Sequence, residues 1–460
     1  ISNVSTRILS AVSIIILANH LGPEDYGIFN ISIAFAFVAG YFTDVGMVNT
    51  VIREASKKDN DISAIFSTYI KLRLLLLIIT LIFSYYVIKI FYGYEDNKLI
   101  LSMFLLVFPM IIGLGLQSIS VAYFQVIEEM DKIARIRIFS SLLSSVCIFL
   151  GIYNGLGLLE ISFLYGFSYI IAGIYGLYLL NKRIVITFRI KGKFHKGILK
   201  GLSSFIISGL LVMLLPQLGP LILEKTLNLK DVGYFSVAQK IVVALYQIPG
   251  VIAGAFYPVL FRHFNNGDYR LHLELNTQQV KFMSIIGMIL SIPLFFYPHW
   301  IIDMFLGEEW KNTTNILKLL SLIVLLQSIN FPIGDGLTTR GRQDLRTLVL
   351  AIATISGCGY YYILSKLYGV SGAVVAAILI EVTLLLGFLV SCRERIYIIK
   401  NGLFYNILAY LLVYVIGLGI KDFLNFYLGV ITLTLAFIFA LFVMDRNLKS
   451  NVRFIIGRKG

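Results

Sequence analysis

Three ionisable side chains lie in or at the end of the two long apolar runs near the start of the chain: Arg7, Asp44 and Arg53. At ~1.5 Å of rise per helical residue, Arg7 and Asp44 both lie roughly 20–25 Å from the turn that joins these runs, and so at a similar depth. A charge inside a membrane span is costly and usually has a function or a charged partner. Because a guanidinium binds phosphate oxygens bidentately and stays charged, Arg7 is the first candidate for contact with an anionic substrate. An ion pair between Arg7 and Asp44 is the alternative.

Four basic residues, Arg53 among them, lie near the ends of apolar runs. Arg53 follows the second run, where it can contact substrate or act as an ordinary basic anchor at the membrane surface. Lys71 and Arg73 stand at the start of the third run, and we expect them to extend to the membrane interface. Lys240 lies about 8 Å inside the opposite face, which allows either a substrate contact or the same extension to the interface.

Glu381 lies near the middle of a late apolar run and has no basic neighbour in the sequence. A carboxylate at this depth can carry a coupling H⁺ or Na⁺, or it can pair with Lys240. The sequence contains no glycine-rich phosphate loop, no paired metal ligands and no nucleophile elbow. Its three cysteines have no spacing typical of a disulfide framework or a zinc site. We therefore predict no catalytic residue, no metal site and no cofactor.

Long helices in lipid have to position these side chains. Of the 460 residues, 58% are hydrophobic and 14% are charged, and the mean hydropathy is +0.86. A soluble domain carries about 25% charged residues. Apolar runs of about 20 residues recur along the chain, which is the length that spans a bilayer as a helix. The sequence therefore predicts an all-α integral membrane protein with about 14 transmembrane helices.

Basic residues alternate from loop to loop. Every second loop, together with the C-terminal tail, holds 27 lysines and arginines in total, and the intervening loops hold 6. By the positive-inside rule, the chain is a multi-pass protein of the cell (inner or plasma) membrane with both termini in the cytoplasm. The net charge of +14 is explained by these loops and by contact with membrane lipids, so we expect no nucleic-acid partner. His195, in the most basic loop, is expected to be solvated. The chain begins at Ile1 without a start methionine, so we expect a few upstream residues to be missing.

A repeat divides the chain into halves. LGPEDYGIF (Leu21–Phe29) and LNLKDVGYF (Leu227–Phe235) share four residues at the same spacing, 206 positions apart. Each segment joins the first two spans of its half. Because each half has six spans, both enter the membrane from the same side and are related by an axis along the membrane normal. The predicted organisation is an N-lobe (1–180), a basic cytoplasmic linker (181–201), a C-lobe (202–391), and two extra helices with a basic tail (392–460).

The first two apolar runs and the turn between them also resemble a known family. The arginine in the first span, the turn LGPEDYGIF, the segment DVG (Asp44–Gly46) and the segment IRE (Ile52–Glu54) resemble the Wzx-type polysaccharide and O-antigen flippases. These belong to the MOP exporter superfamily, with the MATE exporters and the lipid II flippase. The resemblance implies a MATE-like fold of two pseudo-symmetric six-helix lobes. It also implies alternating access through a cationic central cavity, with Arg7 and Arg53 at the family's arginine positions and Lys240 as the clear basic residue of a later span.

The implied activity is translocation of a polyprenyl-(pyro)phosphate-linked oligosaccharide from the cytoplasmic to the outer leaflet. The implied partners are this lipid, a polysaccharide polymerase and glycosyltransferases. Two alternatives remain. A MATE-type drug or cation antiporter is disfavoured because an organic-cation cavity should be acidic or aromatic. A membrane polymerase or O-acyltransferase is disfavoured because no intervening loop exceeds 13 residues, which leaves no room for a sizeable external active-site loop.

Overall fold

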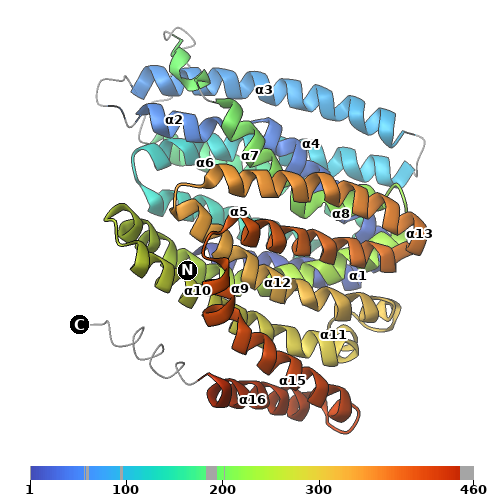
Figure 1. Cartoon of the computed structure of the whole chain (residues 1–460). Coiled ribbons are helices and arrows are strands. Elements are labelled where there is room, and N and C mark those ends of the chain that lie inside the picture. Colours follow the sequence, from blue (N-terminus) through green and yellow to red (C-terminus); the bar gives the residue numbers. More distant parts are fainter. Residues whose placement is uncertain are drawn as a thin grey trace. The chain divides into compact units, whose positions relative to one another are not determined.

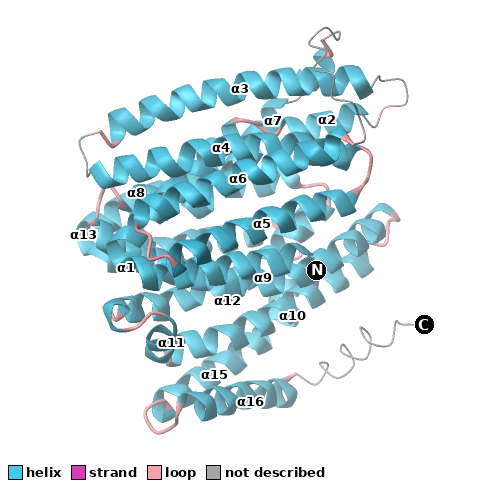
Figure 2. Cartoon of the chain, turned by 180° about the vertical axis from the view of Figure 1, so that it is seen from behind, coloured by secondary structure: helices cyan, strands magenta, loops and turns pink. Residues whose placement is uncertain are grey.

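The computed structural model describes residues 2–55, 57, 62–93, 97–182, 194–200 and 202–445, without the side chains of 2–8, 11, 203–205 and 251. Over these ranges the regular secondary structure is helical and contains no strand (Figure 2). The predicted all-α class is thus confirmed. It follows from the environment, because a segment that crosses lipid has to satisfy its backbone hydrogen bonds internally.

The chain packs into two compact units, Ile1–Ser236 and Val237–Gly460. The first contains α1 (Ser2–Phe42), α2 (Met47–Ala55), α3 (Ile62–Phe91), α4 (Asn97–Val126), α5 (Met130–Tyr153), α6 (Leu158–Asn181), the short η1 (Lys196–Leu199), α7 (Leu202–Leu214), α8 (Leu218–Leu223) and the start of α9 (Leu229–Asn265). The second contains the rest of α9, α10 (Tyr269–Phe296), α11 (Pro298–Phe305), α12 (Thr313–Thr339), α13 (Gln343–Ser391), α14 (Arg395–Ile398), α15 (Phe404–Ile420) and α16 (Phe426–Met444). The lobe boundaries drawn from the repeat remain a prediction.

Two long helices, α1 and α13, are each broken at a glycine. Among the described residues, 12 helical segments are long and apolar enough to cross a membrane. α1 is broken at Gly22 (φ 73°) and α13 at Gly369 (φ 60°), in the left-handed region that favours glycine. The 49 residues of α13 would extend for about 74 Å if straight, more than twice the ~30 Å hydrocarbon core. Each of these helices therefore makes two crossings, which confirms a multi-pass protein with about 14 spans.

In the first unit, α4 packs along α6 and also contacts α3. A hydrogen bond between the hydroxyls of Ser102 and Ser162, 2.9 Å apart, joins α4 to α6. Small and hydroxyl side chains are the usual contacts between helices in lipid. A separate apolar cluster that includes Met47, Val51 and Tyr69 packs α2 against α3. This packing brings the turn between α1 and α2 close to α3.

In the second unit, α10 packs against α12, and α15 and α16 form a hairpin that contacts α10 (Figure 1, Figure 2). Their shared core is rich in aromatic residues and includes Phe296, Tyr410 and Phe437. A buried ion pair between Lys281 of α10 and Asp445, directly after α16, joins the same elements. The two extra C-terminal helices are thus packed firmly on the second unit.

Candidate substrate and ion sites

Arg7 lies on α1, but its side chain is outside the described residues. Its contact with an anionic substrate and its pairing with Asp44 both stay predictions.

Asp44 lies in the turn between α1 and α2, and its side chain is 19% exposed. Its Oδ1 accepts a hydrogen bond from the Tyr69 hydroxyl at 3.1 Å and pairs with Arg73 Nη1 at 2.6 Å. Its Oδ2 accepts a hydrogen bond from the Val48 N–H at 3.4 Å. Asp44 is therefore held by α3 and by the first turn of α2, and part of it remains accessible.

The predicted extension of Arg73 to the membrane interface is wrong. The Arg73 side chain is only 3% exposed and is paired with Asp44. Arg73 follows Tyr69 by four residues, so both project from one face of α3, and this face is packed against α2. A buried guanidinium requires a counter-charge, which Asp44 supplies. Asp44 therefore has an ion-pair partner in Arg73, and its pairing with Arg7 stays a prediction.

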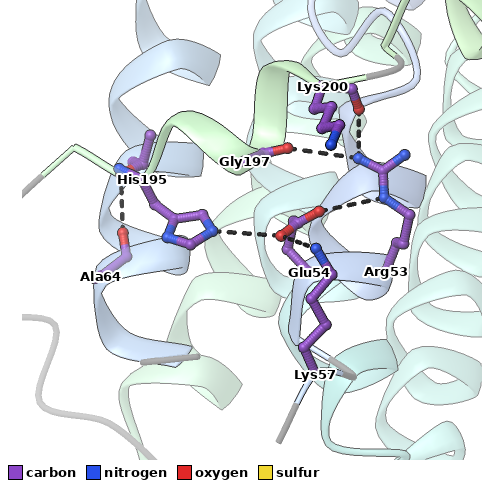
Figure 3. A network of polar contacts seen from close by, with 8 residues as sticks. Arg53, Glu54, Lys57, Ala64, His195, Gly197 and Lys200 are labelled. Atoms are coloured by element: carbon purple, nitrogen blue, oxygen red, sulfur yellow. Dashed lines mark hydrogen bonds and ion pairs between the residues drawn. The ribbon is translucent and has the colours of Figure 1, made fainter. Parts of the chain in front are cut away.

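Arg53 belongs to a polar cluster around the buried carboxylate of Glu54, whose side chain is 3% exposed (Figure 3). Glu54 Oε1 pairs with Arg53 Nε at 3.3 Å, and Glu54 Oε2 pairs with Lys57 Nζ at 2.7 Å. Arg53 Nη2 also donates to the carbonyl oxygens of Gly197, at 3.5 Å, and of Lys200. Arg53 and Glu54 thus join the end of α2 to the segment 194–200.

The expectation that His195 is solvated and lacks partners is wrong. Its backbone N–H donates to Thr68 Oγ1 at 3.0 Å. Its Nε2 lies 3.5 Å from Glu54 Oε2 (Figure 3). A buried carboxylate has to be paired, and the basic linker segment supplies one of its partners. Arg53 is still 38% exposed, so contact with substrate and a role as a basic anchor at the membrane surface both stay predictions. The structure adds its contacts with the linker segment.

Replacement of Glu54 tests how the linker segment is held. Glu54→Ala removes the carboxylate shared by Arg53, Lys57 and His195, and a hydrogen bond to a charged group contributes about 1.5–3 kcal/mol. We expect the segment 194–200 to detach, so that trypsin cuts the linker at least tenfold faster in detergent. Asp131→Ala is the control, because Asp131 is 57% exposed and its ion pairs with Lys132 and Arg135 are superficial. Equal cleavage rates in both variants would contradict this role of Glu54.

Lys240 and Glu381 do not pair with each other. Lys240 is partly exposed on α9, and within the part of the chain that the structure describes no ion pair joins it to Glu381. Glu381, on the second half of α13, is 6% exposed. Its carboxylate accepts hydrogen bonds from the side-chain amides of Asn330, at 2.9 Å, and of Gln327. The pairing alternative is therefore wrong.

The surroundings of Glu381 define a possible ion site. Asn330 Nδ2 also donates to the Glu381 carbonyl oxygen at 3.0 Å, which fixes α12 against α13 at this point. The site thus consists of one buried carboxylate and two amides that can each offer an oxygen after rotation. The carboxylate can receive a proton, and the carboxylate and amide oxygens together can coordinate a monovalent cation. Among the described residues, no group of three histidine, cysteine or acidic side chains could hold a metal ion.

The chain matches known proteins along most of its length. The family model described as "Polysaccharide biosynthesis protein" matches residues 1–264. A Shigella flexneri protein named "Putative O-antigen transporter" is 23% identical over 380 residues, which cover 78% of this chain and 88% of that protein.

Two solved structures have a similar fold. The lipid II flippase MurJ in an inward closed conformation has a TM-score of 0.74 at 17% identity, with 97% of this chain and 98% of MurJ covered. A MATE family multidrug resistance transporter of the MOP superfamily, in an inward-facing conformation, has a TM-score of 0.72 at 15% identity, with 86% and 96% covered. The predicted MATE-like fold is thus confirmed. The similar proteins are named as transporters and a flippase, which agrees with the prediction that the chain is not an enzyme. Because the family model covers more than half of the chain, the chain belongs to the polysaccharide biosynthesis protein family, with the fold of the MOP-superfamily transporters.

Proposed function

We propose that the chain moves a polyprenyl-(pyro)phosphate-linked oligosaccharide from the cytoplasmic to the outer leaflet by alternating access. The main support is the match of residues 1–264 to a family of polysaccharide biosynthesis, in a chain with a flippase-like fold. The loops rich in lysine and arginine face the cytoplasm in this proposal, because the basic and the weakly charged loops alternate. Both termini are then cytoplasmic.

The physical task is to carry a charged and hydroxyl-rich head group through hydrocarbon. Transfer of such polar groups without new partners is uphill by many kcal/mol. A wet cavity lined by cationic side chains lowers this cost, because Arg and Lys replace water at the phosphate oxygens. In this proposal Arg7, Arg53 and Lys240 contact the head group, and Asp44 forms part of the same site. The polyprenyl chain needs no polar site and stays in the bilayer.

Reconstitution tests this proposal. Vesicles that contain the protein and a fluorescent polyprenyl-pyrophosphate oligosaccharide should expose the sugar to an external lectin much faster than vesicles without protein. The same vesicles should not accumulate a fluorescent organic cation, the cargo expected of a drug antiporter. Sugar exposure at the protein-free rate, in vesicles with correctly folded protein, would contradict the proposed activity.

Glu381 is proposed as the residue that couples transport to H⁺ or Na⁺. The Glu381→Gln variant keeps the shape of the side chain and a hydrogen bond to Asn330 but cannot carry the charge. We expect transport in this variant to lose its dependence on an imposed ion gradient, with at most a small change in stability. Asn401→Asp, at a site where the asparagine only bonds the carbonyl oxygen of Tyr397, serves as a surface control. A gradient dependence equal to that of the parent would remove Glu381 from coupling.

A further inference from the structure

The two copies of the sequence repeat contact each other within the first unit. Gly27 and Gly233 occupy the same position in LGPEDYGIF and LNLKDVGYF, and so do Pro23 and Leu229. A Cβ atom on Gly27 would overlap the carbonyl oxygen of Leu229 and would lie 3.1 Å from the Gly233 nitrogen. A Cβ atom on Gly233 would overlap the carbonyl oxygen of Pro23. The two backbones thus approach so closely that neither glycine position has room for a side chain.

These contacts are reciprocal. Gly27 of the first copy meets Leu229 of the second, and Gly233 of the second meets Pro23 of the first. Since Leu229 is the repeat equivalent of Pro23, the pattern is that of a self-complementary interface about a two-fold axis. The contact thus has the reciprocity expected of the pseudo-two-fold relation that the repeat implies. The reciprocal glycine contact in the structure thus agrees with the repeat, which is visible in the sequence alone.

The contact is surrounded by buried side chains and is supported at two other points. The flanking aromatic residues Tyr26, Phe29 and Phe235 are fully buried. Lys225, just after α8, donates to the Phe91 carbonyl oxygen at 2.7 Å and lies 4.4 Å from the centre of the Tyr92 ring.

The second supporting contact lies further along α1, away from the repeat turns. The Tyr41 hydroxyl of α1 donates to the Ile206 carbonyl oxygen of α7 at 2.8 Å, about 20 Å along α1 from Gly27. Within the first unit, α1 is therefore joined to α7 and to the start of α9, and the repeat turns lie at the end that carries few basic residues.

We propose that the Gly27–Gly233 contact is a gate at the outer face, which separates when the sugar head group leaves. The direction of release rests on the proposed function and orientation, whereas the contact itself does not. Glycine is required at both positions because any side chain would hold the two turns apart. Gly27 and Gly233 thus act as positioning residues for closure and do not themselves bind cargo.

Accessibility of a buried cysteine tests the gate without any cargo. Ser236 is 1% exposed and lies three residues after Gly233, on the same face of α9. In a background with Cys147, Cys358 and Cys392 replaced by serine, Ser236→Cys should react slowly with a membrane-impermeant thiol reagent. Adding Gly27→Ala or Gly233→Ala should raise the labelling rate at least tenfold. The double substitution should add little, because the contact is already broken.

Gly254→Ala is the matched control, since Gly254 lies on the same helix and an added Cβ would meet nothing within 4 Å. Its labelling rate should equal that of the parent. Gel filtration in detergent confirms that each variant is folded. Parent-like labelling in folded Gly27→Ala and Gly233→Ala variants would overturn the gate.

A cleavable cross-link tests the same contact in a variant that keeps both glycines. Tyr92→Cys with Lys225→Cys, joined by a bis-maleimide that contains a disulfide, should hold this end closed. Transport of the lipid-linked sugar should stop on cross-linking and return on reduction. Continued transport with the link complete would overturn the gate. If the unlinked protein moves no lipid-linked sugar while the labelling results hold, the proposed cargo is wrong and the gate stands.

Discussion

Arg7→Glu is expected to abolish export of the lipid-linked sugar while the protein still inserts and folds. The substitution removes the proposed charge-assisted hydrogen bond to phosphate, worth about 1.5–3 kcal/mol, and adds repulsion between two anions. Loss of 3 kcal/mol alone corresponds to roughly a hundredfold weaker binding. The measurement is sugar export in cells that lack their own transporter, normalised to the amount of protein in the membrane.

Two controls separate a substrate contact from a general effect of charge. Arg7→Lys keeps the positive charge but loses the bidentate geometry, so we expect partial export. Arg270→Glu reverses a charge at a side chain that is 94% exposed, and we expect export close to that of the parent. Full export by a correctly inserted Arg7→Glu variant would remove Arg7 from the mechanism.

The fold was accessible from the sequence because it depends on features that recur along the chain. Apolar runs of spanning length and alternating basic loops predicted the all-α membrane class and about 14 spans. The repeat turns were visible as LGPEDYGIF and LNLKDVGYF, and the break at Gly22 lies in the first of them. Their direct contact through Gly27 and Gly233 was not predictable, because similarity between two segments does not show that they meet.

The candidate site was accessible only in part, because pairing depends on which helices become neighbours. The sequence identified Asp44 and Glu381 as buried charges but not their partners. Asn330 and Gln327 had a readable signal, since two amides three residues apart in an apolar run share one helix face. Arg73 was misjudged because its position near the start of a run suggested the interface, and the packing of α2 on α3 was not visible. Glu54 and His195 are 141 residues apart, and no local pattern connects them.

Neutralising the Asp44–Arg73 pair separates its structural role from a role in transport. Asp44→Ala alone leaves the buried Arg73 guanidinium without a counter-charge, which should cost about 3–5 kcal/mol and lower the unfolding temperature and the amount of protein in the membrane. The double variant Asp44→Asn with Arg73→Met replaces both charges by neutral groups of similar size, and such replacements of buried pairs are often neutral for stability. We expect the double variant to regain most of the unfolding temperature but not sugar export, because the partly exposed Asp44 carboxylate belongs to the proposed substrate site. Thermal unfolding in detergent and export in cells provide the two measurements. Normal export by the stable double variant would mean that Asp44 serves only to hold α3 in place.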